Sequence, residues 1–454
     1  MGTLDSARST TRAPLPGTSL LNAKPRFARI VFAPFTHTAV ASFPVLILYL
    51  TAALAALLAA WLLLRYRQER QYRRRPYVAP AHSDWLLHEP DPATPPLHRV
   101  ALLGDPGAVA TTGPDPILEL LTGWQQQTGA AGTVIILGDN VYPTGLPAPE
   151  HPGRAAAVAR LDVLLEALRA FKGRVVFLSG NHDWNKGRPD GYEYLLRQEA
   201  YIKERLPAAH YLPVGGTPGP VTLQLAEGLL LVVLNTQWWV QQGPRPASDP
   251  KAPFRELEQV LTDNRHQRII VAGHHPLYSN ALHGGKFTAK QHVFPLTTVH
   301  KRAYVPLPFI GSLLPLYRKL IGAAEDMAHP RYRKMRRRLL RVLHQHPHLI
   351  YAAGHDHNLQ YFERHGSHYL VSGAGSKTAF VQKAGRATFV HEHTGFFSLD
   401  YYASGETWLR TLEPDATGLP LPEVFRQRLY PGPVVAPQLV AAPTLVRKPA
   451  ELPL

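Results

Sequence analysis

Short apolar runs recur along the middle of the chain and predict buried strands. Each run has four to six consecutive apolar residues. Such runs are typical of strands that are buried on both faces of a sheet. They lie at Val100–Leu103, Val134–Leu137, Val175–Leu178, Leu229–Leu234, Ile269–Ala272 and Leu349–Ala352. Alternating segments at Tyr369–Ser372 and Phe396–Tyr402 predict further strands.

Apolar positions three to four residues apart predict helices between these runs. Asp115 and Pro116 supply an N-cap and a first helical residue for the segment Ile117–Trp124. Ala155–Phe171 and Phe254–Leu261 show the same spacing. Because strands alternate with helices, the pattern predicts an α/β fold.

The most apolar stretch, from Pro44 to Leu64, predicts a transmembrane helix. No charged residue occurs between Ile30 and Leu64, and roughly 20 apolar residues cross a bilayer core. A cleaved signal peptide is the alternative, but a long segment precedes the stretch and Arg65 follows it without a small-residue cleavage site. Arginines are more numerous after the span than before it, so the positive-inside rule places the C-terminal part in the cytoplasm.

Charge is concentrated in two segments of the chain. The net charge is +16, and residues 1–80 and 301–341 each carry +9, which leaves the remainder close to neutral. No broad basic face or nucleic-acid recognition motif is present, so anionic lipid is the better partner and nucleic acid is excluded. The absence of cysteine rules out disulfides, thiolate metal sites and thiol catalysis.

Composition divides the chain into five expected parts. These are an N-terminal basic segment (1–43), the transmembrane helix (44–64), a basic and Pro-rich tether (65–97), an α/β domain (98–410) and a Pro-rich tail (411–454). The domain includes a basic and apolar insert at about 286–346. Residues 303–341 of it suggest a contact with anionic lipid, and a solvated basic helix is the alternative.

Glycine and a metal-donor side chain follow five of the apolar runs. The donors are Asp105, Asp139 with Tyr142, Asn181, His274, and His355 with His357. In open α/β sheets, ligands bind beyond the carboxyl ends of the strands, so these side chains are expected to converge. Seven oxygen and nitrogen donors are too many for one ion and suit two.

The motif series resembles the calcineurin-like metallophosphoesterase superfamily, and within it the small, tartrate-resistant-type purple acid phosphatases. The motifs stand at Asp105–Gly107, Gly138–Tyr142, Gly180–Asp183, Val271–His274 and Gly354–His357. The resemblance covers about residues 98–410 and implies two packed mixed β-sheets flanked by helices, an αββα sandwich. Tyr142 separates the purple acid phosphatase branch from the rest of the superfamily, because most other members have histidine where Gly107 stands and lack this tyrosine.

The resemblance implies the following site. Asp105, Asp139, Tyr142 and His357 would hold Fe(III), and Asn181, His274 and His355 would hold a divalent Fe, Zn or Mn, with Asp139 bridging the two. His182 and His283 are the expected catalytic residues, which bind substrate and protonate the leaving group. His275, Asp356 and Asp183 are expected to support the ligands.

The expected activity is that of a membrane-anchored phosphoesterase that hydrolyses phosphate monoesters by attack of metal-bound hydroxide. Its substrate would be a phosphorylated small molecule or a membrane-proximal phosphate ester. A phosphodiesterase acting on nucleotide or lipid head-group phosphates, and a non-catalytic phosphate-binding module, are the alternatives. The resemblance implies a domain outside the cytoplasm, whereas the arginine asymmetry favours the inside.

Overall fold

A computed structural model describes residues 38–72, 75–414 and 422–432, apart from positions 248, 299, 301, 308, 309 and 384. Residues 1–37 of the expected N-terminal segment lie outside the described residues, as do residues 415–421 and 433–454 of the expected tail. The chain divides into two compact units, residues 1–61 and 62–454.

Helix α1 (Thr38–Tyr72) contains the candidate membrane span. Its segment Pro44–Gln68 has a mean hydropathy of 2.4, and none of it is buried within the protein. By length and composition this segment can cross a membrane, and it extends four residues beyond the predicted end at Leu64. The helix continues past the apolar stretch because the residues that follow it, from Arg65 on, also favour helix.

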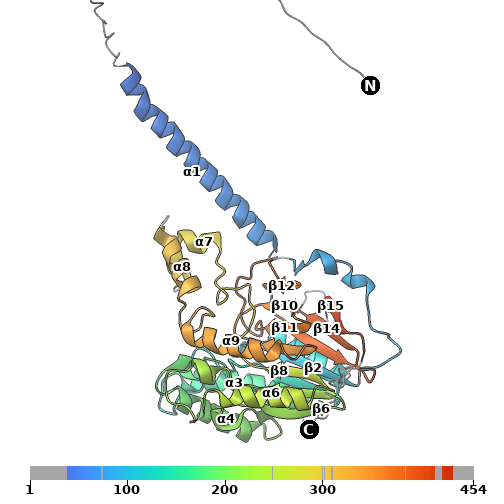
Figure 1. Ribbon diagram of the computed structural model, residues 1–454. Coiled ribbons are helices and arrows are strands. Elements are labelled where there is room, and N and C mark those ends of the chain that lie inside the picture. Colours follow the sequence, from blue (N-terminus) through green and yellow to red (C-terminus); the bar gives the residue numbers. More distant parts are fainter. Residues whose placement is uncertain are drawn as a thin grey trace, which may run out of the picture. The chain divides into compact units, whose positions relative to one another are not determined.

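The second unit contains two mixed β-sheets (Figure 1). The first has the strand order β1 (Tyr77–Val78), β12 (Phe389–His391), β10 (Leu359–Arg364), β11 (Ser367–Ser372), β9 (Leu349–Ala353), β8 (Arg268–Ala272), β7 (Leu229–Val233) and β6 (Val221–Ala226). The second has the order β15 (Glu423–Tyr430), β14 (Thr407–Leu412), β13 (Phe396–Tyr401), β2 (His98–Leu103), β3 (Gly132–Ile136), β4 (Arg174–Phe177) and β5 (His210–Tyr211). All six predicted runs are therefore strands.

Helices connect and cover these strands. They are α2 (Pro116–Thr128), α3 (Arg154–Arg169), α4 (Gly191–Arg205), α5 (Gln237–Val240), α6 (Ala252–Asp263), α7 (Ala289–Val293), α8 (Leu313–Leu320) and α9 (Pro330–Leu343). Helix α2 begins as predicted, because the Asp115 carboxylate accepts hydrogen bonds from the backbone N–H groups of Ile117 and Leu118.

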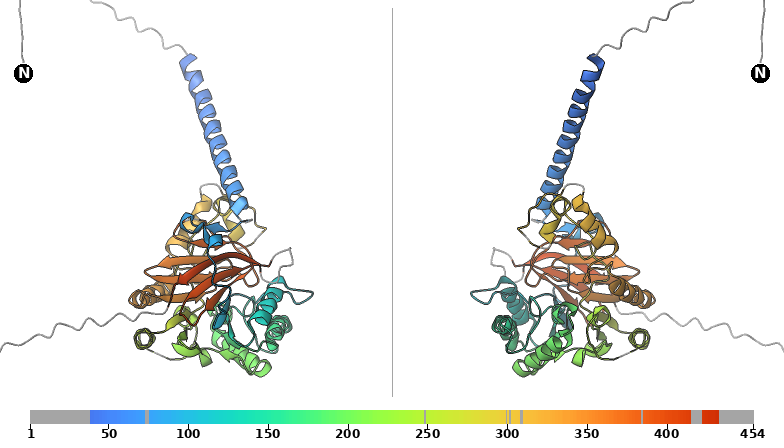
Figure 2. Two further views of the ribbon diagram at one scale, coloured as in Figure 1. Left: turned by 90° about the vertical axis from the view of Figure 1, so that its right-hand side faces the viewer. Right: turned by 90° about the vertical axis from the view of Figure 1, so that its left-hand side faces the viewer.

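Three apolar clusters make the unit a four-layer sandwich (Figures 1 and 2). The central cluster joins the inner faces of both sheets, for example Leu102 of β2 with Leu231 of β7. A second cluster packs α6 and α9 on the first sheet, and a third packs α2, α3 and α4 on the second sheet. The sequence expectation of two packed mixed sheets flanked by helices is confirmed.

Two expected boundaries differ from the structure. Residues 423–430, assigned to the tail, form β15, whose Phe425 is completely buried between the sheets. Residues 77–78, assigned to the tether, form β1, which pairs with β12. Both segments are short and flanked by proline or polar residues, so only the tertiary contacts reveal that they belong to the body.

Candidate metal centre

The predicted donor-bearing turns meet where the carboxyl ends of both sheets come together. Strands β2 to β5 are parallel in the second sheet, and β7 to β9 are parallel in the first. The turns also bond across the sandwich. The backbone N–H of His355 donates to Asp105 Oδ2 at 2.7 Å, and the His274 ring bonds to the Leu137 carbonyl at 2.9 Å.

Three of these turns hold a non-glycine residue in the left-handed backbone region. φ is +60° at Asp105, +55° at Asp139 and +71° at His355. Such residues cost roughly 1–3 kcal/mol each and persist only where the surroundings over-determine them, as at functional sites. Gly107 lies in the same crowded turn, where a Cβ would be 2.6 Å from the Asp139 carbonyl oxygen. No larger residue fits this backbone.

The Tyr142 hydroxyl lies at the centre of the first group of donors. It is 2.8 Å from Asp105 Oδ1, 3.0 Å from Asp139 Oδ2 and 2.9 Å from His357 Nε2. A phenol carries one proton, so two buried carboxylate oxygens share a single hydroxyl donor. This group therefore holds more acceptor capacity than its own protons satisfy.

Asn181, His274 and His355 form the second group. The Nδ1 atom of His274 faces the Leu137 carbonyl, and Nε2 of His355 faces the Glu325 carbonyl at 2.8 Å. A carbonyl only accepts, so each of these ring nitrogens carries a proton, and in the neutral form of each ring the opposite nitrogen has a lone pair.

These two lone pairs point at each other and at a third. His274 Nε2 lies 3.2 Å from His355 Nδ1, and both lie within 3.0 Å of Asn181 Oδ1. The amide orientation is set by Asn181 Nδ2, which donates to Glu325 Oε1 at 3.0 Å. Three acceptors directed at one another without a proton repel, whereas a cation among them would be stabilised.

Asp139 connects the two groups. Its Oδ2 accepts from Tyr142, and its Oδ1 lies 3.5 Å from His274 Nε2. Ligand atoms of Asp105, Asp139 and His274 all lie within 4.8 Å of one another, and all three residues are buried. The position of Asp139 is the one that a bridging carboxylate requires.

Burial shifts the pKa of several of these groups toward their neutral forms. It raises the pKa of Tyr142 well above its usual value, and burial together with the Asp139 charge does the same to Asp105. It lowers the pKa of His355 well below its usual value, and burial and Lys377 lower that of His357 to about 4. Both imidazoles are therefore neutral at ordinary pH, the form that coordinates metals.

The donor set fits two cations on these grounds. A phenol, carboxylates and one imidazole suit a hard ion, and an amide oxygen with two imidazoles suits a borderline divalent ion. Asp183 braces the centre, because its carboxylate accepts from the backbone N–H groups of Asp139, Asn140 and Gly180 at 2.7–2.9 Å.

The two expected catalytic histidines both lie at this centre. The Nδ1 atom of His182 donates to the Pro143 carbonyl at 2.6 Å, which turns Nε2 toward Asp139 Oδ2, 3.8 Å away. The His283 ring packs against the His355 ring with centroids 4.2 Å apart, and its Nδ1 bonds Asp326 Oδ1 at 3.0 Å. His283 is held from the insert, a contact that the sequence did not predict.

Glu325 and Asp326 of the insert are functional candidates that sequence reasoning missed. Glu325 contacts Asn181 through its carboxylate and His355 through its carbonyl, as described above. Asp326 accepts from both His283 and Arg318. A signal existed, because these are the only acidic residues between positions 301 and 341.

Lys377 is a third candidate that was missed. Its ammonium group lies 3.1 Å from the centroid of the Tyr142 ring. Burial lowers its pKa to about 8, against the opposing pull of Asp139 and Asp105. Lys377 follows β11, which is parallel to β9, after a Gly-rich turn. The criterion applied to the other strand ends, a glycine followed by a polar side chain, would also have identified Lys377.

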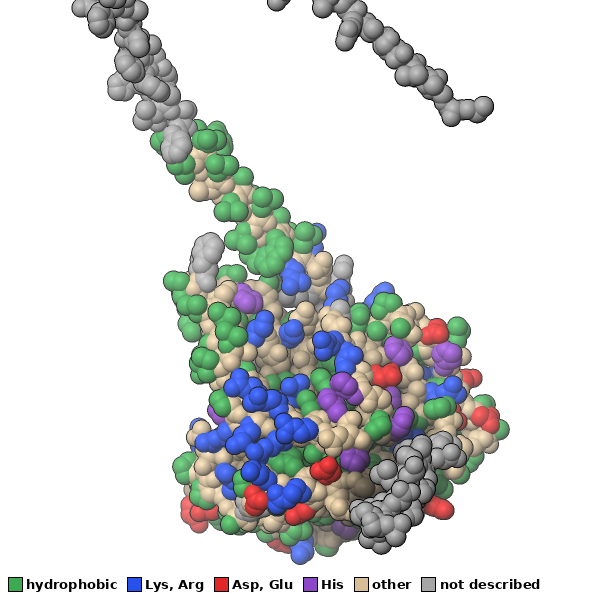
Figure 3. Space-filling view, in the orientation of Figure 1, with side chains coloured by type: hydrophobic (Ala, Val, Ile, Leu, Met, Phe, Trp, Pro, Cys, Tyr) green, Lys and Arg blue, Asp and Glu red, His purple; other side chains and the backbone are tan. Residues whose placement is uncertain are grey.

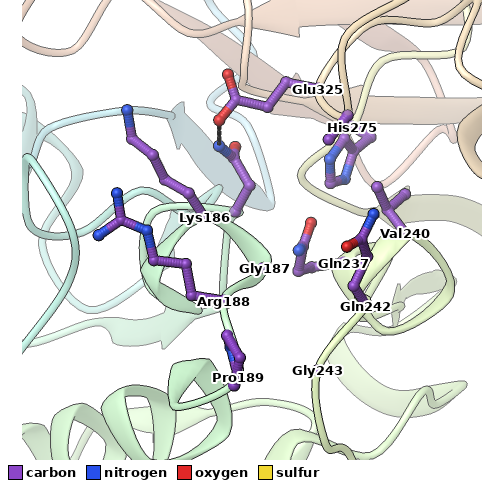
Figure 4. A pocket seen from close by; sticks show the side chains of 12 residues that line it. Lys186, Gly187, Arg188, Pro189, Gln237, Val240, Gln242, Gly243, His275 and Glu325 are labelled. Atoms are coloured by element: carbon purple, nitrogen blue, oxygen red, sulfur yellow. Dashed lines mark hydrogen bonds between the residues drawn. The ribbon is translucent and has the colours of Figure 1, made fainter.

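A cavity of about 410 Å³ opens beside the second donor group (Figure 4). Its lining includes the candidate ligand Asn181, and Figure 4 shows Glu325 at one end, with Lys186 and Arg188 on one wall and His275 on the other. The His275 Nδ1 atom bonds the Thr236 hydroxyl at 2.8 Å, and its Nε2 atom is buried without a partner. The cavity thus offers cationic groups and a buried imidazole next to the candidate metal ligands.

Residues 98–304 match the family model of the calcineurin-like phosphoesterases. The structure is similar to the one titled "GAP50 the anchor in the inner membrane complex of Plasmodium", with 15% identity over 73% of this chain and 88% of that chain and a TM-score of 0.43. It is similar to the purple acid phosphatase PPD1 of yellow lupin (Lupinus luteus) seeds, with 15% identity over 74% of this chain and 55% of that chain and a TM-score of 0.44.

A structure of PhoD is also similar, with 12% identity over 74% of this chain and 73% of that chain and a TM-score of 0.42. No curated protein sequence matches the chain. The family match agrees with the calcineurin-like superfamily that the motifs resemble, over residues 98–304.

Proposed function

We propose that the protein is a membrane-anchored, dinuclear-metal phosphoesterase that hydrolyses phosphate monoesters, in the manner of a purple acid phosphatase. Asp105, Asp139, Tyr142 and His357 would hold Fe(III), and Asn181, His274 and His355 would hold a divalent Fe, Zn or Mn. Asp139 would bridge the two ions.

One observation carries the proposal. Asn181 Oδ1, His274 Nε2 and His355 Nδ1 direct three lone pairs at one another within 3.2 Å. A protein that had no use for a cation here would replace at least one of them with a donor or an apolar group, since each unpaired buried acceptor costs about 1–3 kcal/mol. The Tyr142 hydroxyl beside two carboxylates supports a second ion next to the first.

The surrounding residues support phosphoryl chemistry. A bound pair of cations supplies the Lewis acidity that polarises a phosphate and activates water. His182 presents Nε2 toward the centre, where it can hold the proton that a leaving oxygen needs. His283 is oriented by Asp326, and Lys186 and Lys377 both place positive charge near the ligands, which favours an anionic substrate.

The anchor is the segment Pro44–Gln68, which we propose to cross the membrane once. The phosphoesterase domain follows it in the chain, so it would act on phosphate esters close to a membrane surface. A reporter fused to the C-terminus distinguishes a cytoplasmic domain, which the arginines after the span favour, from a domain on the other side.

The test compares the full chain, purified in detergent and loaded with Fe and Zn, on p-nitrophenyl phosphate and on its bis ester. We expect the monoester to be hydrolysed faster, with both rates abolished by chelator. His182→Ala should lower kcat by about 10²–10⁴-fold without reducing bound metal. Faster hydrolysis of the bis ester would make the protein a phosphodiesterase. Bound metal and bound phosphate with no hydrolysis of either ester would make it a non-catalytic phosphate-binding protein.

A further inference from the structure

Residues 289–321, here called the arm, expose an unusual number of large apolar side chains. They include Leu296, Tyr304, Val305, Ile310, Leu313, Leu316, Tyr317, Leu320 and Ile321, all between 41% and 66% exposed. Figure 3 shows apolar side chains along the edge formed by α8. Soluble surfaces rarely keep such residues together, so a concentration of this kind marks a surface that meets protein or lipid.

Within the part of the chain that the structure describes, internal hydrogen bonds hold the arm in an ordered conformation. Thr288 and Gln291 form a reciprocal capping box at the start of α7. The His292 ring bonds the Ser312 hydroxyl at 3.1 Å, and the Leu307 N–H donates to the Val293 carbonyl at 2.8 Å. These bonds join the two sides of the arm, so its apolar side chains stay exposed in a defined conformation.

An ion pair fixes the base of the arm to the body. The Arg318 guanidinium donates two hydrogen bonds to the buried Asp326 carboxylate, at 2.6 and 2.9 Å. Asp326 also bonds His283 at the candidate metal centre. Arg318 therefore uses its charge inward, while Leu316 and Leu320 on the same helix remain exposed. The apolar surface has a fixed position relative to the phosphoesterase site.

The charge of the arm and its surroundings indicates which partner the apolar surface contacts. From Gly284 to Ala324 the sequence contains no Asp or Glu, and it contains six Lys and Arg residues. Lys319 is exposed and directly precedes the exposed Leu320 in α8. A protein partner would not require this one-sided charge, whereas an anionic lipid surface attracts cations at its head groups and buries apolar side chains beneath them.

The position of the arm is consistent with a membrane. The arm lies at the same end of the body as β12, on which β1 pairs, in both views (Figures 1 and 2). Strand β1 begins at Tyr77, and eight residues separate it from the end of the candidate span at Gln68. Eight residues extend over at most roughly 30 Å, so an anchored chain keeps this end of the body within reach of the head groups.

We propose that the arm is a second membrane contact: its apolar edge, centred on Leu313, Leu316 and Leu320, inserts into the interface of an anionic phospholipid bilayer. The inference rests on the proposed anchoring through Pro44–Gln68. The basic helix α9 is not part of the inserted surface, because Tyr332, Met335 and Leu339 pack in the core. Its arginines and lysines, which gather over α9 in Figure 3, add attraction at longer range.

The absence of cysteine allows a direct test in the full chain. Leu316→Cys and Leu320→Cys are labelled separately with an environment-sensitive dye and reconstituted into bilayers with or without phosphatidylserine, at a low ratio of protein to lipid. Doxyl groups on the lipid tails serve as the quencher. Val214→Cys, which is 63% exposed in the short helical turn Val214–Gly216, is the control for a solvent-exposed site, and Leu57→Cys is the control for the span.

We expect blue-shifted, lipid-quenched emission at positions 316 and 320 and at 57, but not at 214, with stronger quenching in phosphatidylserine than in neutral lipid. Quenching at 57 alone would overturn the inference and leave the anchoring intact, and quenching at none would remove the anchoring too. Equal quenching in both lipids would overturn the choice of anionic lipid. A blue shift without lipid quenching would assign the surface to a second copy or to the chain's own tail.

Discussion

Glu325 lies outside the predicted ligand set and touches two of its members. Its carboxylate accepts from Asn181 Nδ2 at 3.0 Å, and its backbone carbonyl accepts from His355 Nε2 at 2.8 Å. Glu325→Ala removes the first contact and keeps the second. Without the carboxylate, the Asn181 amide can rotate and turn its nitrogen, rather than its oxygen, toward His274 and His355.

The magnitude follows from the contact that is lost. A hydrogen bond to a charged group contributes about 1.5–3 kcal/mol, and the partial exposure of Glu325 reduces this toward the lower limit. About 1.4 kcal/mol corresponds to a tenfold change in a binding constant. Partners that orient metal ligands typically contribute 10–100-fold in affinity, so we expect the divalent ion to bind about tenfold more weakly in Glu325→Ala.

The assay is competition for Zn²⁺ between the full chain and a chromophoric chelator. Glu325→Gln keeps an acceptor oxygen and should lose less affinity than Glu325→Ala. Glu193→Ala, which removes an exposed partner of Arg197 on α4, is the matched control and should bind Zn²⁺ like the original protein. With Zn²⁺ in excess, kcat and KM of Glu325→Ala should return close to their original values.

Two results would refute this reasoning. If Glu325→Ala binds Zn²⁺ within about twofold of the original affinity, the carboxylate does not orient Asn181 and the mechanism is wrong. If KM for p-nitrophenyl phosphate remains raised when Zn²⁺ is saturating, Glu325 acts on the substrate in the adjoining cavity instead of on the metal ligand.

Three further predictions follow from the same contacts. Tyr142→Phe should abolish the visible absorption of the iron-loaded protein, measured by spectroscopy beside metal analysis, because the phenol oxygen is lost. Lys377→Met should raise KM for a phosphate ester by about tenfold with bound metal unchanged in the same metal analysis, since one cation beside the site is removed. Burial opposes ionisation of Asp326, but His283 and Arg318 lower its pKa to about 2, from an ordinary 3.8. Its ion pair should therefore contribute about 2 kcal/mol above pH 4 and lose it as the pH falls toward 2, seen as smaller hydrogen-exchange protection factors in residues 313–328 at pH 3 than at pH 5, each taken relative to the intrinsic exchange rate at the same pH.

Much of the fold could be predicted because the buried strands carry their own signal. Val134–Leu137 and Leu349–Ala352 are apolar on both faces, which is required of parallel strands covered by helices. The same signal fails at β15, where residues such as Arg426 and Arg428 alternate with Phe425 near the expected tail. An edge strand needs one buried face only, and its partner β14 lies earlier in the chain, so pairing decides its existence.

The cluster of donor side chains could be predicted because every predicted ligand follows a glycine-containing turn at a strand end. Tyr142 and His357 were expected near Asp105, and the structure brings both into contact or near contact with it. Glu325 and Asp326 escaped prediction because they lie in an insert whose composition indicates only a basic surface. Nothing in the local sequence indicates that the chain there returns to Asn181 and His283.

The amino-acid sequence alone determined the strand runs, the strand-end donors and the apolar span, because each depends on residues close together in the chain. Only the tertiary structure decided that the lone pairs of Asn181, His274 and His355 meet, and that Asp326 connects the arm to His283. It also decided that α9 packs its apolar side chains in the core, whereas α8 leaves its apolar side chains exposed. These depend on the packing of segments up to hundreds of residues apart, whose relative positions are set by burying apolar surface across two sheets rather than by local propensity.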